Sequence, residues 1–171
     1  MQNIYLIGFM GSGKSTVAAV FEKQHQMQLI EMDQRISEQE GMTIPQIFEK
    51  NGEAYFRSLE TELLKGLQGR ENKIVSCGGG VVLRPENVEF MKDNGTIVLL
   101  WAKPKTILDR VKGNSDRPLL NGNMNEEYIR AMMEERKPKY KMAADIVVHT
   151  DGKNALEIYN EIVEKIKNRR K

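Results

Sequence analysis

The sequence predicts an α/β fold, in which a five-stranded parallel sheet is flanked by helices on both faces. Five short apolar runs are separated by longer stretches with the spacing of amphipathic helices; the runs cover residues 4–7, 29–30, 73–77, 96–101 and 145–148. Strands that alternate with helices are typical of parallel sheets, because a parallel pair needs a long crossover connection. The carboxyl ends of the strands should then meet at one edge, where α/β proteins bind their ligands.

The composition fits one soluble domain spanning residues 1–171. The chain has 171 residues, of which 40% are hydrophobic, enough for a core that needs no disulfide or metal. Its net charge of +2 gives no reason to expect nucleic acid or a membrane surface as a partner. We find no targeting segment and no apolar run of bilayer length, and Cys77 is the single cysteine. We therefore expect a cytoplasmic protein.

The first strand leads into a glycine-rich loop. Residues 8–15 read Gly-Phe-Met-Gly-Ser-Gly-Lys-Ser and match the pattern G-x-x-x-x-G-K-[ST], with a helix pattern directly after them. In such a loop the backbone N–H groups and the helix dipole hold phosphate oxygens, Lys14 places its charge on the β- and γ-phosphates, and Ser15 can ligate Mg²⁺. The motif predicts a P-loop NTPase fold that binds a nucleoside triphosphate.

The second strand ends in two acidic residues, Glu31 and Asp33. Beside a phosphate loop, a carboxylate can hold Mg²⁺ through water or accept a proton from an attacking hydroxyl. Asp33 also heads a helix pattern, so it could instead cap that helix or serve both purposes. Its place at a strand end favours a function.

Arg57 lies in a helical stretch that follows a helix beginning near Pro45. Its neighbours Glu53 and Glu60 stand at the spacings i−4 and i+3. These spacings by themselves predict an ion-pair ladder on the surface of the helix.

The third strand runs into three consecutive glycines, Gly78 to Gly80. Glycines have no side chain to pack and lose much conformational entropy on folding. Three in a row therefore indicate either a close approach of the backbone to a ligand or a tight turn.

Further helices are predicted to begin at Pro85 and Pro104. After them, residues 112–125 contain two glycines, one proline and four asparagines without helical periodicity, which predicts a mobile lid. Arg117 lies in this segment, where it either reaches a transferring phosphoryl group on closure or remains solvated.

The helix that begins after Asn125 carries a charge on its apolar face. Arg136 falls on the same face as Ile129, Met132, Met133 and Tyr140. A guanidinium in that position needs a carboxylate or phosphate partner. The last helix is predicted to face the core with Leu156, Tyr159, Ile162, Val163 and Ile166, and its basic C-terminal end complements the helix dipole.

Together these residues resemble the shikimate kinase family over essentially the whole chain. The resemblance rests on the phosphate loop, Asp33, the F-R-x-x-E pattern within residues 52–60, the triple glycine, the R-P-L-L sequence from Arg117, and Arg136 followed by Lys-Pro-Lys-Tyr. It implies ATP-dependent phosphorylation of the 3-hydroxyl of shikimate, in aromatic amino-acid biosynthesis, by a monomer that uses Mg²⁺. One departure is Glu31, since the family usually has an aspartate there, in a D-x-D pattern.

The resemblance also implies roles for individual residues. The substrate-binding helical segment would span residues 33–61. The residues that bind shikimate would be Asp33, Arg57, Gly78, Gly79, Gly80 and Arg136. Both arginines would bind its carboxylate, and Glu60 would hold Arg57 in place. Asp33, Lys14 and Arg117 would be catalytic. ATP would be bound by Gly11, Ser12, Gly13, Lys14, Ser15, Thr16, Arg110, Arg117 and Lys153, with Arg110 against the adenine. Ser15 and Glu31 would hold Mg²⁺.

Two other functions fit parts of the sequence. A small kinase acting on gluconate or a nucleoside monophosphate would have a similar size and lid. A nucleotide switch that recruits a partner would not need an acceptor site at all. Against the switch, the guanine-recognition pattern N-K-x-D is missing, since Asn72 and Lys73 are followed by Ile74 and Val75.

Overall fold

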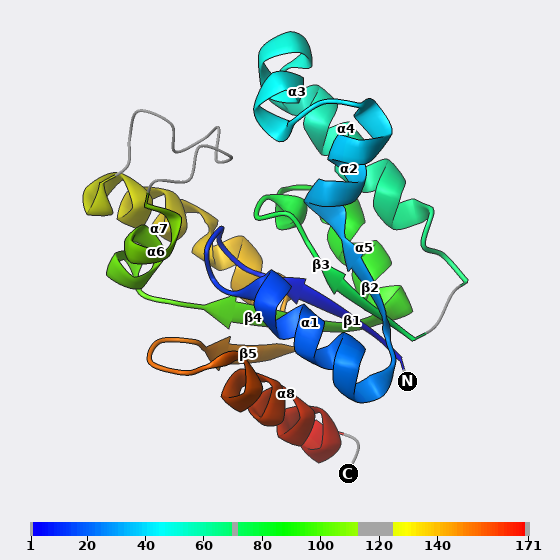
Figure 1. Cartoon of the computed structure of the whole chain (residues 1–171), viewed down its shortest axis with the longest axis vertical. Coiled ribbons are helices and arrows are strands. Elements are labelled where there is room, and N and C mark those ends of the chain that lie inside the picture. Colours follow the sequence, from blue (N-terminus) through cyan, green and yellow to red (C-terminus); the bar gives the residue numbers. More distant parts are fainter. Residues whose placement is uncertain (1, 70–71, 113–124, 170–171) are drawn as a thin grey trace.

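The computed structural model describes residues 2–69, 72–112 and 125–169, and these ranges contain a five-stranded parallel sheet (Figure 1). The strands are β1 (Asn3–Ile7), β2 (Gln28–Glu31), β3 (Lys73–Ser76), β4 (Gly95–Trp101) and β5 (Ile146–His149), in the spatial order β2-β3-β1-β4-β5. Every pair is parallel; for example, Leu6 lies opposite Ser76 on one side and Val98 on the other. The predicted α/β fold and its five strands are confirmed.

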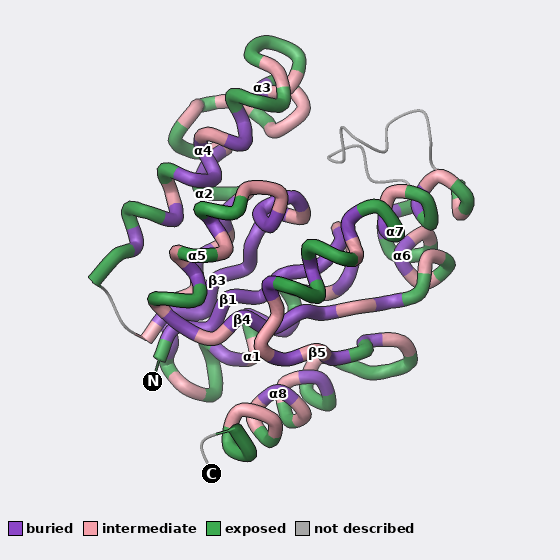
Figure 2. Tube along the Cα trace, turned by 180° about the vertical axis from the view of Figure 1, so that it is seen from behind, coloured by how far each residue is buried: buried purple, intermediate pink, exposed green. Residues whose placement is uncertain are grey.

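Helices cover both faces of the sheet. Side chains on β1 point alternately to the two faces, so this strand contributes to a core on each side. Ile4 and Leu6 pack against α1 (Lys14–His25) and α8 (Ala155–Arg169). Tyr5 and Ile7 pack in a second core to which α5 (Pro85–Asn94), α6 (Pro104–Val111) and α7 (Glu126–Ala143) contribute. Figure 2 shows the buried strands between these layers. Helices begin at or beside Pro45, Pro85 and Pro104, as predicted.

Three helices after β2 form a smaller unit beyond the carboxyl end of that strand (Figure 1). They are α2 (Met32–Glu40), α3 (Ile44–Asn51) and α4 (Glu53–Lys65), and they bury their own cluster of Ile36, Ile47, Phe56 and Leu59. Because α4 also contacts α5 and the short 3-10 helix η1 (Val81–Leu83), this unit is held beside the loop that follows β3. The residues predicted to bind a substrate at 33–61 all lie in it.

The structure corrects one prediction and excludes one alternative. Tyr159, Ile162, Val163 and Ile166 of α8 pack in the core as predicted, but Leu156 is 52% exposed and Ile158 is buried instead. Asp33 is not a helix cap, because α2 begins at Met32 and its N-cap residue is Glu31. Within the described ranges, no helix combines the length and apolar composition that crossing a bilayer requires.

Candidate active site

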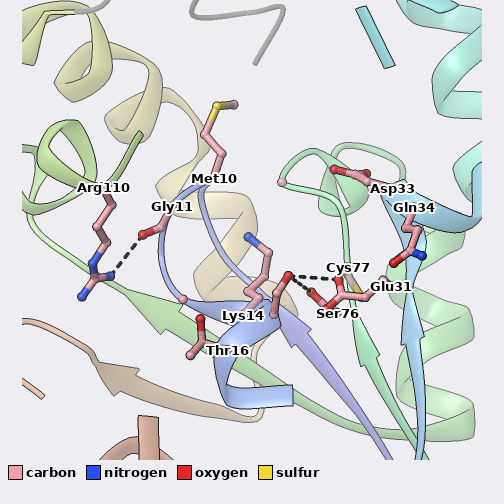
Figure 3. A pocket seen from close by; sticks show the side chains of 13 residues that line it. Met10, Gly11, Lys14, Thr16, Glu31, Asp33, Gln34, Ser76, Cys77 and Arg110 are labelled. Atoms are coloured by element: carbon pink, nitrogen blue, oxygen red, sulfur yellow. Dashed lines mark hydrogen bonds between the residues drawn. The ribbon is translucent and has the colours of Figure 1, made fainter. Parts of the chain in front are cut away.

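A cleft of about 620 Å³ opens at the carboxyl edge of the sheet, between the loop after β1 and the ends of β2 and β3 (Figure 3). Its walls come from five places in the chain: Met10, Gly11, Gly13, Lys14, Ser15 and Thr16; Glu31, Asp33 and Gln34; Ser76 and Cys77; Gly79; and Arg110. A cleft of this volume holds a small ligand. The parallel topology therefore brings the predicted phosphate loop and the acidic strand end together.

The phosphate loop has the conformation that its sequence predicts. Gly13 adopts φ 100° at the N-cap of α1, a left-handed conformation that suits glycine. Lys14 is buried, and its Nζ donates hydrogen bonds to the carbonyl oxygens of Gly8 (2.8 Å) and Phe9 (3.0 Å). The loop thus wraps around the ammonium group of Lys14. The N-terminus of α1, which would receive a phosphate, lies directly behind this loop in the sequence.

Ser15 and Glu31 both line the cleft, and Figure 3 shows Glu31 beside Ser76. The Ser15 hydroxyl donates to Oε2 of Glu31 at 3.0 Å, and its Oγ lies 3.3 Å from Oγ of Ser76. Hydroxyl and carboxylate oxygens are the ligands that Mg²⁺ prefers, usually together with substrate phosphates and water. The donor set therefore fits Mg²⁺, and the longer side chain of Glu31 still reaches the serine.

Asp33 lies in the first turn of α2 and lines the cleft. Its Oδ1 atom is buried and has no hydrogen-bond partner among the described residues. A buried carboxylate oxygen without a donor loses free energy unless a ligand supplies one. This atom is the expected partner of a ligand hydroxyl.

Arg57 forms both predicted ion pairs, but the pair with Glu60 is buried and only Glu53 lies on the surface. Its Nη1 donates to Oε1 of Glu60 at 2.7 Å, and its Nη2 donates to Glu53 at 3.1 Å. Only 8% of Arg57 is exposed and none of Glu60. The surface-ladder interpretation was wrong because the packing of α4 turns this face toward the loop after β3.

The three glycines let that loop pack directly against charged groups. A Cβ atom on Gly78 would lie 2.3 Å from Oε2 of Glu60, and one on Gly80 would lie 2.3 Å from Nη1 of Arg57. Carbon atoms of real side chains do not approach so closely, so no larger residue fits without displacing the ion pair. Close approach to the neighbouring side chains therefore explains Gly78 and Gly80.

Arg136 reaches the same loop from the other side. It lies on α7, 6% exposed, with its Cζ 5.9 Å from the ring centre of Phe9. Its Nη1 lies 3.8 Å from where a Cβ on Gly79 would stand, and this buried atom has no hydrogen-bond partner among the described residues. The predicted place of Arg136 on the apolar face of its helix is confirmed, and its free donor is available to an anion.

Arg110, expected against the adenine, and Lys153, expected to bind ATP, both lie beside Thr150, which follows β5. Arg110 donates to the carbonyl oxygen of Gly11 at 3.1 Å and to both oxygens of Thr150 at 3.3 and 3.4 Å. Lys153 lies in the turn after β5, where its Nζ donates to Glu161 at 2.6 Å, and it does not line the cleft. Ser12 is buried under the loop, whereas Thr16 lines the cleft.

Arg117 and residues 113–124 of the predicted lid lie outside the described residues.

Sequence reasoning missed two residues of this site. Ser76 is the last residue of β3 and contacts Ser15, a position that the strand order alone would have flagged. Tyr140 was assigned only to the core, but its hydroxyl donates to the carbonyl oxygen of Gly79. Cys77 is buried, and burial raises the pKa of its thiol so that it stays neutral.

Replacing Gly78 by alanine should destabilise the protein. The added methyl group overlaps Oε2 of the buried Glu60, and overpacking of this kind costs about 1–3 kcal/mol. Urea unfolding measures the loss. The matched control is Gly66→Ala at the end of α4, where φ is −66° and no neighbouring atom would lie closer than 3.4 Å. The control should change the free energy of unfolding by less than about 1 kcal/mol, and an equal loss in both variants would contradict the packing explanation.

The burial of Glu60 should give stability a pH dependence. Burial raises the pKa of Glu60 from 4.5 to about 7, although Arg57 opposes the shift. The folded state therefore binds this proton more tightly than the unfolded state, and the resulting stabilisation is lost as the pH rises from 4.5 through about 7. We expect the stability of the wild type relative to Glu60→Gln to fall by about 3 kcal/mol over this interval. Paired urea titrations at several pH values measure it, and a relative stability that rises with pH would refute the assignment.

The chain is similar to known proteins over nearly its whole length. A sequence model of the family described as shikimate kinase matches residues 10–167. A shikimate kinase of Sulfurihydrogenibium sp. (strain YO3AOP1) is 44% identical over 169 residues, which cover 99% of this chain and 100% of the relative. The solved shikimate kinase from Acinetobacter baumannii in complex with shikimate has a TM-score of 0.94 at 33% identity, covering 99% of this chain and 94% of that one.

A more distant structure bears on the alternative of another small kinase. A gluconokinase from Sinorhizobium meliloti 1021 covers 98% of this chain with a TM-score of 0.64, at 18% identity. This likeness shows a common fold and nothing about the acceptor.

Proposed function

The chain belongs to the shikimate kinase family and phosphorylates shikimate with ATP, and we propose that it does so between the phosphate loop and a pair of buried arginines. One observation carries the assignment of residues. Two guanidinium groups lie against the triple-glycine loop, Arg57 beside Gly80 and Arg136 beside Gly79. Gly79 in turn lines the cleft together with the phosphate loop and Asp33. A small acid with several hydroxyl groups fits such a site in one direction only.

The nucleotide occupies the part of the site next to the phosphate loop. In our proposal, residues Gly11 to Thr16 hold the phosphates through backbone N–H groups, with the Lys14 ammonium on the β- and γ-phosphates. Arg110 and the turn that contains Lys153 flank the adenine; they are neighbours, since the N–H of Lys153 and the guanidinium of Arg110 both bond to Thr150. Arg117 would join the phosphates from the predicted lid.

The acceptor, shikimate, occupies the part of the site next to the triple-glycine loop. The carboxylate of shikimate takes the donors of Arg57 and Arg136, and the backbone of Gly78 to Gly80 lies along the ring. Glu60 keeps the Arg57 fork oriented through its 2.7 Å bond. Asp33, whose Oδ1 lacks a donor among the described residues, accepts the hydrogen bond of the 3-hydroxyl.

Transfer needs positioning and neutralisation of charge more than covalent chemistry. Asp33 orients the 3-hydroxyl and takes its proton as the oxygen attacks the γ-phosphorus, and the bond from that phosphorus to the bridging oxygen breaks to release ADP. Lys14 and Arg117 offset the negative charge on the phosphoryl oxygens. Ser15 and Glu31 would hold Mg²⁺, which when bound neutralises charge on the β- and γ-phosphates. We also propose that the protein acts as a monomer, which is what its resemblance to the family implies.

A panel of acceptors tests this function. Purified protein with Mg²⁺ and ATP is assayed for ADP release with shikimate, gluconate, nucleoside monophosphates and no acceptor. We expect release with shikimate alone. Release with another acceptor would overturn the carboxylate site but keep the phosphate loop, and binding of ATP without release in any arm would favour the nucleotide switch.

A further inference from the structure

Tyr140 places a single polar atom at the back of the acceptor site. It is fully buried in the core on α7, and its ring packs edge-on against Trp101 with centres 6.2 Å apart. Its hydroxyl leaves this apolar surrounding to donate a hydrogen bond to the carbonyl oxygen of Gly79, in the middle of the triple-glycine loop. Burial raises the pKa of Tyr140, so the hydroxyl keeps the proton that this bond needs.

The same hydroxyl also meets Arg136. The two residues are four positions apart on α7, a spacing that puts them on one face of the helix. The Arg136 guanidinium lowers the pKa of Tyr140 and so opposes the effect of burial, and its Nη1 lies 3.8 Å from where a Cβ on Gly79 would stand. The Tyr140 hydroxyl therefore lies between α7, the triple-glycine loop and Arg136. The proposed function assigns this loop and Arg136 to the binding of shikimate.

The bond to Gly79 fixes more than one carbonyl group. No cis peptide is found among the described residues, and in a trans peptide the C=O of one residue and the N–H of the next point in opposite directions. Holding the Gly79 oxygen against Tyr140, on the core side, thus directs the N–H of Gly80 away from the core. Without this anchor the glycine loop has no side chain of its own to set the peptide plane.

We propose that Tyr140 is a positioning residue for the acceptor: its hydroxyl sets the Gly79–Gly80 peptide and the Arg136 guanidinium in the orientation that receives shikimate. The inference rests on the proposed function, because it takes this loop and Arg136 as the shikimate site. Tyr140 touches neither the reacting atoms nor the nucleotide in this account. Its loss should weaken acceptor binding and leave the chemical step nearly intact.

The test compares Tyr140→Phe with a matched control, Tyr159→Phe. Both changes remove one hydroxyl and keep the ring; the Tyr159 hydroxyl bonds to Nε2 of His25 at 2.8 Å, on the α1–α8 side of the sheet. For Tyr140→Phe we expect the KM for shikimate to rise about 10-fold, the effect of losing a hydrogen bond within a charged network. The KM for ATP and kcat should stay within about threefold, and the control should stay near wild type in all three.

A second readout does not depend on turnover. In ¹H–¹⁵N spectra of the ligand-free proteins, the Gly80 amide resonance should move or broaden in Tyr140→Phe and stay in place in Tyr159→Phe. An unchanged Gly80 resonance, or a Tyr140→Phe variant that loses only thermal stability with both KM values unchanged, would overturn the inference. A wild-type protein that does not phosphorylate shikimate would instead overturn the proposed function, and the Gly80 resonance would still decide whether Tyr140 holds the loop.

Discussion

Asp33→Asn should lower kcat by about two orders of magnitude or more, with little change in folding. Asparagine has the same shape but cannot take a proton, and the loss of a positioned general base costs about 10²–10⁴-fold. The prediction depends on the buried Oδ1 of Asp33, which has no donor among the described residues and faces the cleft. Steady-state kinetics with shikimate and ATP give kcat directly.

The control for this change is Asp93→Asn, an exposed aspartate on α5 outside the cleft. It makes the same chemical change and should leave kcat within about twofold, as is usual for surface substitutions. A normal kcat in Asp33→Asn would remove Asp33 from the mechanism. A loss in both variants would point to an effect of net charge instead.

Arg136→Ala should have the second-largest effect, on binding of shikimate. Removing one partner of a buried charged pair costs about 2–5 kcal/mol, which corresponds to a loss of about 30- to 5,000-fold in kcat/KM. Arg136 is a cleaner test than Arg57, because Arg57 also neutralises the buried Glu60 and its removal would destabilise the fold. Initial rates at varied shikimate and fixed ATP measure the loss.

Arg130→Ala on the same helix serves as the comparison. Arg130 is exposed and pairs with Glu126 at 3.0 Å, so its removal should leave kcat/KM for shikimate near wild type. Arg136→Lys keeps the charge but not the planar fork, and should recover only part of the lost rate. If Arg136→Ala bound shikimate normally, the carboxylate would lie elsewhere.

The phosphate loop could be predicted from sequence because its structure is local. Eight consecutive residues contain the glycine that needs a left-handed conformation, the lysine and the serine, and the helix that follows them begins within the motif. The strands could be predicted for a similar reason, since each is a short apolar run bounded by polar residues or glycine.

The environment of Arg57 could not be predicted in this way. The spacing to Glu53 and Glu60 shows which residues pair along one helix, but not whether that face meets solvent or another segment. Here the loop after β3 covers it, and only the tertiary fold brings that loop to α4. The role of Tyr140 was hidden for the same reason, because its bond to Gly79 joins residues 61 positions apart.

The stripe on α8 shows a different limit. Apolar residues at positions 156, 158, 159, 162, 163 and 166 allow two overlapping faces, and helical spacing alone does not choose between them. Packing against α1 and β5 selects the face of Ile158 and Ile162 and leaves Leu156 exposed.

The most direct test of the central claim is to identify the phosphorylated product. The protein is incubated with ATP, Mg²⁺ and shikimate, and the mixture is followed by ³¹P NMR with coupling to the ring protons. We expect ADP and one new phosphomonoester signal coupled to the proton on carbon 3 of shikimate, in equal amounts. ADP with inorganic phosphate, or a phosphomonoester on another hydroxyl, would contradict the placement of the 3-hydroxyl between Asp33 and the phosphate loop.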